Sequence, residues 1–294
     1  MPWRQAAGRS AAEAGPPAPF LPLFLCRTDR GACLRGPCVR QRGRCAGTIA
    51  WVSISAGLES DTGDDITAAS EPRLVVAVDG PSGAGKSSAS RGAAIALGLR
   101  YLDTGSMYRA LTWWLLERGA DPSDAGLVAD LAAEPVIEVG TDPQAPWVRV
   151  DGTDVSEAIR TREVTSAVSA VAAVPRVRAL LIAQQRGIIA SLPGIVAEGR
   201  DIGTVVAPEA PVKVFLTADS ASRAGRRAAE TSWSADSTRA EQDRRDRLDA
   251  AQSMKAADAV VIDSTRLGLD QVIDLIVGLA RERAGRPSPR RAGS

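Results

Sequence analysis

The sequence contains no histidine, and after Cys45 it contains no cysteine. The chain therefore has no imidazole that could act as a catalytic base or complete a mixed histidine and cysteine metal site. Aromatic residues make up only 4% of the sequence. No apolar run approaches the roughly 20 residues that a membrane span requires. We therefore expect no membrane association and no chemistry that depends on histidine.

Charge is nearly balanced, because 36 lysines and arginines face 35 aspartates and glutamates, which gives a net charge of +1. This balance gives no reason to expect binding to nucleic acid. Lysine is scarce, with three residues against 33 arginines, so each lysine that remains is informative. The apolar fraction of 45% is enough for a sizeable core. These properties predict a soluble, globular protein of the cytoplasm.

Residues 1–70 are rich in Pro, Gly, Ala, Arg and Ser and show little periodicity, so we predict a poorly ordered basic extension. Its cysteines follow the spacing C-x6-C-x4-C-x6-C, which lacks the C-x2-C pairs of common zinc sites. We expect them to be unpaired, with a metal or disulfide role as the alternative. An over-long translation start is a second interpretation of this segment. Residues 287–294 are predicted to be a disordered tail. The cysteines are Cys26, Cys33, Cys38 and Cys45.

The remaining chain, residues 71–286, alternates between short apolar runs and helical patterns, which is typical of an α/β fold. The apolar runs are continuous rather than alternating, and this indicates a parallel sheet with helices on both faces. Residues 135–156 differ, because their alternating pattern predicts an antiparallel hairpin beside the main sheet. The predicted strands are 74–78, 194–199, 212–218 and 258–264, and the predicted helices are 87–98, 104–118, 161–192 and 268–284.

A phosphate-binding loop follows the first strand. The sequence GPSGAGKS at 80–87 fits G-x-x-x-x-G-K-[ST] in full, between a predicted strand and a predicted helix. In such loops the backbone N–H groups surround the phosphates, the lysine reaches the β and γ phosphates, and the hydroxyl holds Mg²⁺. The alternative is a glycine-rich turn without this function. The predicted ATP-binding residues are Gly80, Pro81, Ser82, Gly83, Ala84, Gly85, Lys86, Ser87 and Ser88, with Ser87 as the Mg²⁺ ligand.

Three further segments carry arginines that could hold a second substrate. Thr104 and Arg109 lie at the start of a predicted helix, where the alternative is a helix cap and a solvated arginine. Arg200 and Asp201 follow the strand at 194–199, at the edge where parallel sheets bind ligands. Their alternative is a surface ion pair. The third segment places three arginines on one helical face, which is either a phosphate clamp or an ordinary basic face: Arg223, Arg226 and Arg227.

From about residue 73 to 284 the chain resembles bacterial cytidylate kinase. The resemblance rests on VDGPSGAGKS, LDTGSMYR, GRDIGTVV, APVKVFL and DAVVIDST, in that order. It implies a parallel sheet with helices on both faces, a nucleoside monophosphate-binding insertion near 132–192, and a mobile lid near 219–250. It also implies transfer of the γ-phosphoryl group of ATP to CMP or dCMP, with Mg²⁺, by an enzyme that we expect to be a monomer.

The resemblance also implies roles for individual residues. The acceptor phosphate would lie near Thr104, Arg109 and Arg200. Ser169, Arg178 and Asp201 would recognise cytosine, and Asp246 would contact the sugar hydroxyls. The residues that act on the transferred group would be Lys86, Arg200, Arg223 and Arg227.

The chain departs from the family after Asp246, where it lacks an expected arginine and a Ser-Pro-Leu turn. This segment is shortened, which predicts either weaker binding of the acceptor or replacement of the missing charge by Lys255. Adenylate, uridylate and shikimate kinases are alternatives within the same class. A catalytically impaired nucleotide-binding regulator is the alternative from another class.

Overall fold

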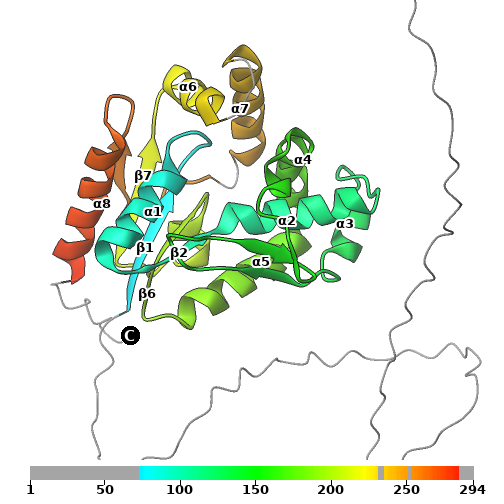
Figure 1. The fold of residues 1–294 in the computed structure, drawn as a ribbon, viewed down its shortest axis with the longest axis horizontal. Coiled ribbons are helices and arrows are strands. Elements are labelled where there is room, and N and C mark those ends of the chain that lie inside the picture. The colour runs from blue at the N-terminus through cyan, green and yellow to red at the C-terminus, as the bar shows by residue number, and fades with distance from the viewer. Residues whose placement is uncertain (1–72, 231–234, 251–252, 285–294) are drawn as a thin grey trace, which may run out of the picture. The chain divides into compact units, whose positions relative to one another are not determined.

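The structure is a computed structural model, and it describes residues 73–230, 235–250 and 253–284. The predicted extension at 1–70, with its four cysteines, and the predicted tail at 287–294 lie outside the described residues, so both remain predictions. The described part of the chain forms the α/β unit shown in Figure 1.

Five parallel strands form the main sheet, in the order β2-β6-β1-β7-β8. Strand β1 is central, because it pairs with β6 on one side and β7 on the other. The loop after β1 therefore opens at the middle of the carboxyl edge, where open parallel sheets bind ligands. The strands are β1 (Leu74–Asp79), β2 (Arg100–Asp103), β6 (Gly194–Gly199), β7 (Val212–Thr217) and β8 (Val260–Asp263).

Each face of the sheet has its own hydrophobic core. Successive side chains of a strand point to opposite faces, so Val76 and Val78 pack with helices α1 and α8, whereas Ala77 packs with α2 and α5. Figure 1 shows α8 on one side of the sheet and α2 and α5 on the other. The predicted fold class is therefore confirmed. The helices are α1 (Lys86–Leu97), α2 (Thr104–Glu117), α5 (Pro175–Ala190) and α8 (Leu269–Ala284).

The predicted hairpin is present and has one more short strand. It forms a three-stranded antiparallel sheet in the order β3-β4-β5. Asp151 and Gly152 connect β4 to β5 with φ angles of 50° and 79°, a left-handed pair that suits a two-residue turn. A short helix, α3 (Ala125–Leu131), precedes this sheet and was not predicted. The strands are β3 (Ile137–Val139), β4 (Val148–Val150) and β5 (Thr153–Asp154).

The single helix predicted at 161–192 is wrong, because this segment forms two helices, α4 (Arg162–Ala173) and α5. Between them Val174 is extended, with ψ at 121°. The residue before a proline is disfavoured in the helical conformation, and Pro175 begins the second helix, where its missing N–H costs nothing. The two helices are bent by 95°. Within the described residues no single helix is long and apolar enough to span a membrane, and this bent pair qualifies by combined length and composition only.

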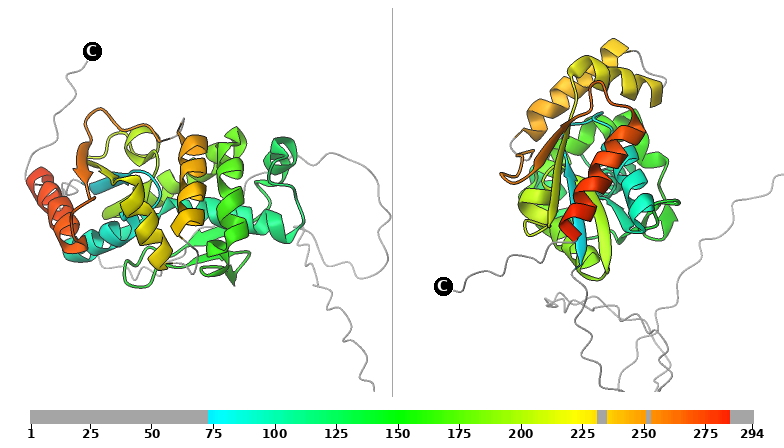
Figure 2. Two further views of the ribbon diagram at one scale, coloured as in Figure 1. Left: turned by 90° about the horizontal axis from the view of Figure 1, so that it is seen from above. Right: turned by 90° about the vertical axis from the view of Figure 1, so that its left-hand side faces the viewer.

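Two helices lie together at the carboxyl edge of the main sheet. They are α6 (Ser220–Glu230) and α7 (Ala235–Asp249), which form the segment predicted as a lid. Figures 1 and 2 show both helices at one end of the sheet, near the loop after β1. A π-helical turn at Ile202–Val206 follows β6, and a 3-10 turn at Ala158–Arg160 precedes α4.

Candidate active site

The loop from Gly80 to Lys86 joins β1 to α1, as predicted for a phosphate-binding loop. Gly80, Gly83 and Gly85 have φ angles of 147°, 77° and 89°, a region that favours glycine. The Lys86 ammonium donates a hydrogen bond to the carbonyl oxygen of Pro81, 2.8 Å away. The Lys86 side chain therefore folds back onto the loop.

Gly80 is the most constrained position of the loop. A Cβ at this residue would lie 2.0 Å from the carbonyl oxygen of Leu216 on β7. We expect Gly80→Ala to lower the free energy of unfolding by about 3 kcal/mol or more, because the clash adds to an unfavourable φ. Gly98→Ala is the matched control, since Gly98 has a φ of 66° but no atom within 4 Å of the added Cβ. Denaturant unfolding should show a smaller loss there, of about 1 kcal/mol, and equal losses would contradict the clash.

Two buried carboxylates lie beneath the loop, at the ends of adjacent strands. Asp79 accepts hydrogen bonds from the backbone N–H groups of Ile202 and Gly203, at 2.7 and 2.8 Å, and so fixes the turn after β6. Burial raises its pKa, and these two hydrogen bonds oppose the rise. Glu198 accepts a hydrogen bond from the Tyr101 hydroxyl. The sequence analysis identified neither carboxylate, although both end strands at the edge where it expected a ligand.

The Lys86 ammonium lies near both carboxylates and near the guanidinium of Arg200. Burial lowers the pKa of Lys86, and the nearby Arg200 guanidinium lowers it further, whereas Glu198 and Asp79 raise it. Burial in turn raises the pKa of Glu198, as does the carboxylate of Asp103. Bound phosphate would supply the negative charge that this lysine and arginine pair favours.

The surroundings of Ser87 fit Mg²⁺. Its side chain is exposed and lines a cavity together with Asp103. The Ser87 hydroxyl also lowers the pKa of the neighbouring Glu198 carboxyl. Mg²⁺ prefers oxygen ligands and keeps several waters when it binds with phosphates. The described residues hold no cluster of three or more acidic or cysteine side chains for a metal, so an ion here would take few protein ligands.

A second pocket opens beside the loop, between α2, α4, α5 and the end of β6. It brings together six of the seven predicted acceptor residues, from four separate segments of the chain. Its other polar residues include Tyr108, Arg245 and Asp249. The six predicted residues in this pocket are Thr104, Arg109, Ser169, Arg178, Arg200 and Asp201.

Contacts within the structure fix several of these side chains. Thr104 does not cap α2, because Asp103 caps it by accepting from the N–H of Ser106 at 3.0 Å. The Thr104 hydroxyl instead donates to the carbonyl oxygen of Glu198 at 2.7 Å. Arg109 donates to the Thr165 hydroxyl at 2.9 Å, which ties α2 to α4.

The three residues predicted to recognise the base lie together in this pocket. Arg178 and Asp201 form an ion pair across the pocket. The Ser169 hydroxyl is buried and has no hydrogen-bond partner among the described residues. A buried polar group without a partner is costly, so a bound molecule with a polar edge would be favoured there.

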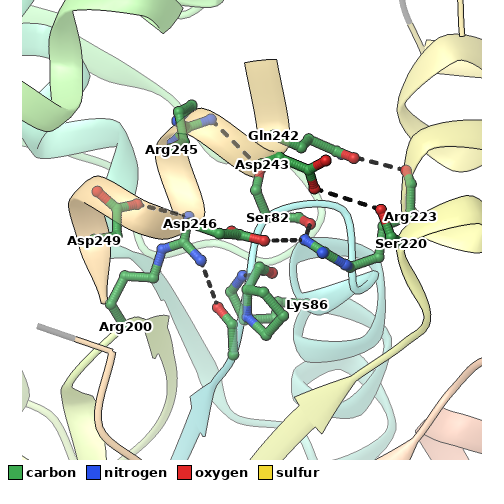
Figure 3. A network of polar contacts seen from close by, with 12 residues as sticks. Ser82, Lys86, Arg200, Ser220, Arg223, Gln242, Asp243, Arg245, Asp246 and Asp249 are labelled. Atoms are coloured by element: carbon green, nitrogen blue, oxygen red, sulfur yellow. Dashed lines mark hydrogen bonds and ion pairs between the residues drawn. The ribbon is translucent and has the colours of Figure 1, made fainter. Parts of the chain in front are cut away.

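Figure 3 shows how α6 and α7 contact the loop. Arg223 donates to the carbonyl oxygen of Ser82 at 3.1 Å and pairs with Asp246 at 2.5 Å. Arg200 donates to the carbonyl oxygen of Gly80 at 3.0 Å and pairs with Asp249 at 2.9 Å. Both arginines are therefore positioned over the loop by carboxylates of α7.

Arg226 of the predicted lid also contacts the loop, because its guanidinium donates to the carbonyl oxygen of Ala84 at 3.4 Å. Arg226 donates to the hydroxyl and carbonyl oxygens of Ser264, at 2.9 and 2.5 Å, and so anchors α6 to the end of β8. The side chain of Arg227 lies outside the described residues, so its role stays a prediction.

The structure brings two α7 residues to the acceptor pocket that sequence reasoning did not select. They are Arg245, whose guanidinium also lies 3.4 Å from the Ser82 hydroxyl, and Asp249. They are four residues apart, so they share one helical face. The predicted sugar ligand Asp246 does not line this pocket and contacts Arg223 instead. Lys255 is exposed and is not among the pocket residues, so in this structure it does not replace the missing arginine.

The chain was compared with known proteins. The family model for cytidylate kinase matches residues 76–282. The chain is 53% identical to a cytidylate kinase of Streptomyces griseus, over 70% of this chain and 92% of that protein. It is 47% identical to a cytidylate kinase of Rhodococcus opacus, over 72% of this chain and 96% of that protein. Among solved structures it is similar to TT1252 from Thermus thermophilus, with a TM-score of 0.38 and 18% identity over 71% of this chain and 97% of that one. The chain belongs to the cytidylate kinase family.

Proposed function

We propose that this protein transfers the γ-phosphoryl group of ATP to CMP or dCMP and forms CDP or dCDP and ADP. The observation that carries the proposal is the position of Arg200. Its guanidinium contacts the phosphate-binding loop at Gly80, and its side chain also lines the acceptor pocket. One cation would thus contact both the donor and the acceptor phosphates, which would favour the alignment and charge neutralisation that direct transfer needs.

The donor half would consist of the loop and Lys86. The backbone N–H groups of the loop would surround the phosphates of ATP, and the ammonium would turn from Pro81 to the β and γ phosphates. A lysine suits this position because its compact charge fits inside a narrow loop, where a planar guanidinium would be too large. Mg²⁺, held through the Ser87 hydroxyl, would neutralise charge on the phosphates.

The acceptor half would hold CMP by its phosphate and by its base. Arg109 and Arg200, with the Thr104 hydroxyl, would bind the acceptor phosphate. Asp201 would accept a hydrogen bond from the exocyclic amine of cytosine, as carboxylates do. Ser169 and Arg178 would donate to the rest of the polar edge.

Transfer itself would need alignment and neutralisation of charge rather than a proton acceptor. Arg223 lies over the loop and would stabilise the charge that spreads over the transferred group, together with Arg227. Closure of α6 and α7 and of the insertion would exclude water, so ATP hydrolysis would be suppressed until the acceptor is bound. We further propose that the protein is a cytoplasmic monomer of pyrimidine nucleotide metabolism that has no nucleic acid partner, in keeping with its net charge of +1.

A nucleotide panel tests the proposal. ADP formation should be measured with CMP, dCMP, UMP, AMP and shikimate, each with ATP and Mg²⁺. We expect CMP and dCMP to be the best acceptors, because Asp201 reads an amine that UMP lacks. If UMP is clearly the better acceptor, the assignment of the base is wrong. Tight ATP binding without ADP formation from any acceptor would instead identify the protein as a regulator.

A further inference from the structure

Buried polar atoms without partners are found at the acceptor pocket and directly behind its lining. Among the described residues, the hydroxyls of Tyr108 and Ser169 and the amide nitrogen of Gln185 are buried and form no hydrogen bond. Ser169 already has a proposed role in binding the base. Tyr108 and Gln185 do not, and a buried polar atom that lacks a hydrogen bond is destabilising.

Tyr108 lies close to the Arg178 and Asp201 ion pair. It is on α2, and its side chain lines the acceptor pocket. Burial raises the pKa of Tyr108 to about 12, the Arg178 guanidinium lowers it, and the Asp201 carboxylate raises it. The phenol therefore stays protonated at neutral pH and can act as a donor beside the carboxylate.

Gln185 lies behind the phenol. It is on α5, seven residues after Arg178, and this spacing places both on the same face of the helix. Its side chain is only 1% exposed, and its interaction with the phenol lowers the pKa of Tyr108, although no hydrogen bond of ordinary geometry joins the two groups. The amide nitrogen without a partner is thus next to a phenol oxygen that can accept a hydrogen bond.

Binding of cytosine would change the partners of Asp201. In this structure Arg178 satisfies its carboxylate, which is on a residue only 7% exposed. An incoming base offers an amine to Asp201 and carbonyl and ring nitrogen acceptors to Arg178. As the arginine turns to the base, the buried carboxylate exchanges a charged donor for a neutral amine, so a further donor would stabilise its negative charge.

We propose that Tyr108 is a positioning residue for recognition of the base. In the occupied site its hydroxyl donates to the Asp201 carboxylate in place of Arg178, while the Gln185 amide donates to the phenol oxygen. This inference rests on the proposed function, because it requires an acceptor with an exocyclic amine. It explains why the hydroxyl has no partner in the ligand-free protein.

Tyr108→Phe provides the test, with steady-state kinetics and thermal unfolding measured on the full chain. We expect the ligand-free melting temperature to be unchanged or higher, because the variant loses only an unpaired hydroxyl. The KM for CMP should rise about tenfold, the typical effect of one hydrogen bond to a charged group. The kcat should change less than about twofold. The preference for CMP over UMP should fall, because UMP has no amine for Asp201. Gln185→Met should act in the same direction with a smaller effect.

Ser90→Ala is the matched control. Ser90 is fully buried on α1, and its hydroxyl likewise has no partner, but it does not line the acceptor pocket. Removal of this hydroxyl should leave the KM for CMP and the KM for UMP unchanged.

Two results would overturn the inference: a KM for CMP that is equal in Tyr108→Phe and wild type, or an equal loss of kcat/KM with CMP and with UMP. If Tyr108→Phe is too unstable to assay, the same criteria apply to Gln185→Met. A wild-type protein inactive with CMP would instead refute the proposed function.

Discussion

Lys86→Ala should abolish phosphoryl transfer, with kcat/KM for ATP falling roughly a thousandfold or more. The reason is that Lys86 is the cation that folds into the loop, where its ammonium now donates to the Pro81 carbonyl. The fold should remain intact, because in this position the lysine is desolvated and close to Arg200, both of which lower its pKa. Kinetics and thermal unfolding of the same preparation measure both effects.

Two further variants distinguish the effect of losing the side chain at position 86 from the effect of losing a positive charge. Lys86→Arg keeps the positive charge but enlarges the group, and we expect it to be nearly as inactive as Lys86→Ala. Lys255→Ala removes an exposed lysine away from both pockets and should retain wild-type activity. Most activity surviving in Lys86→Ala would refute the assignment of this residue to the donor phosphates.

Arg200→Ala should lower kcat/KM for CMP by roughly a hundredfold to a thousandfold. Its guanidinium contacts the loop at Gly80 and lies in the acceptor pocket, so its loss affects both phosphates. It also leaves the carboxylate of Asp249 without the guanidinium that is now 2.9 Å away. Steady-state kinetics with each substrate varied in turn should show a larger rise in KM for CMP than for ATP.

The control for Arg200→Ala is an arginine outside the site. Arg283 donates to the carbonyl oxygen of Pro211 in an exposed position. Arg283→Ala should therefore keep normal kinetics with both substrates. Arg200→Lys should recover only part of the activity, because one ammonium cannot reproduce the forked contacts of a guanidinium. Equal effects of Arg200→Ala and Arg283→Ala would contradict a shared role at the two phosphates.

The phosphate-binding loop and its flanking elements were predictable, because several signals agree there. An apolar run of strand length, glycines at the left-handed positions and an alanine-rich helix each indicate the same structure. Only part of the acceptor pocket was predictable from local patterns, which selected Thr104, Arg109, Arg200 and Asp201, whereas Ser169 and Arg178 came from the resemblance to a family. Thr104, Ser169 and Asp201 come from separate segments, and only the fold brings them together.

Other features could not be read from local patterns, or were misread. The break at Val174 was missed because the apolar periodicity continues through it, although Pro175 gave a local signal. The roles of Arg245 and Asp249 were hidden in a helix rich in charge, where every turn offers similar residues. Their importance follows only from how α7 packs against the loop, as Figure 3 shows.

The fate of the γ-phosphoryl group tests the central claim most directly. The protein should be incubated with ATP labelled at the γ phosphorus, Mg²⁺ and CMP, and the products separated. The two-substrate site predicts that the label appears in the β phosphate of CDP, in amounts equal to the ADP formed, with little release of ADP when CMP is omitted. Label released as inorganic phosphate at the same rate with and without CMP would contradict this account.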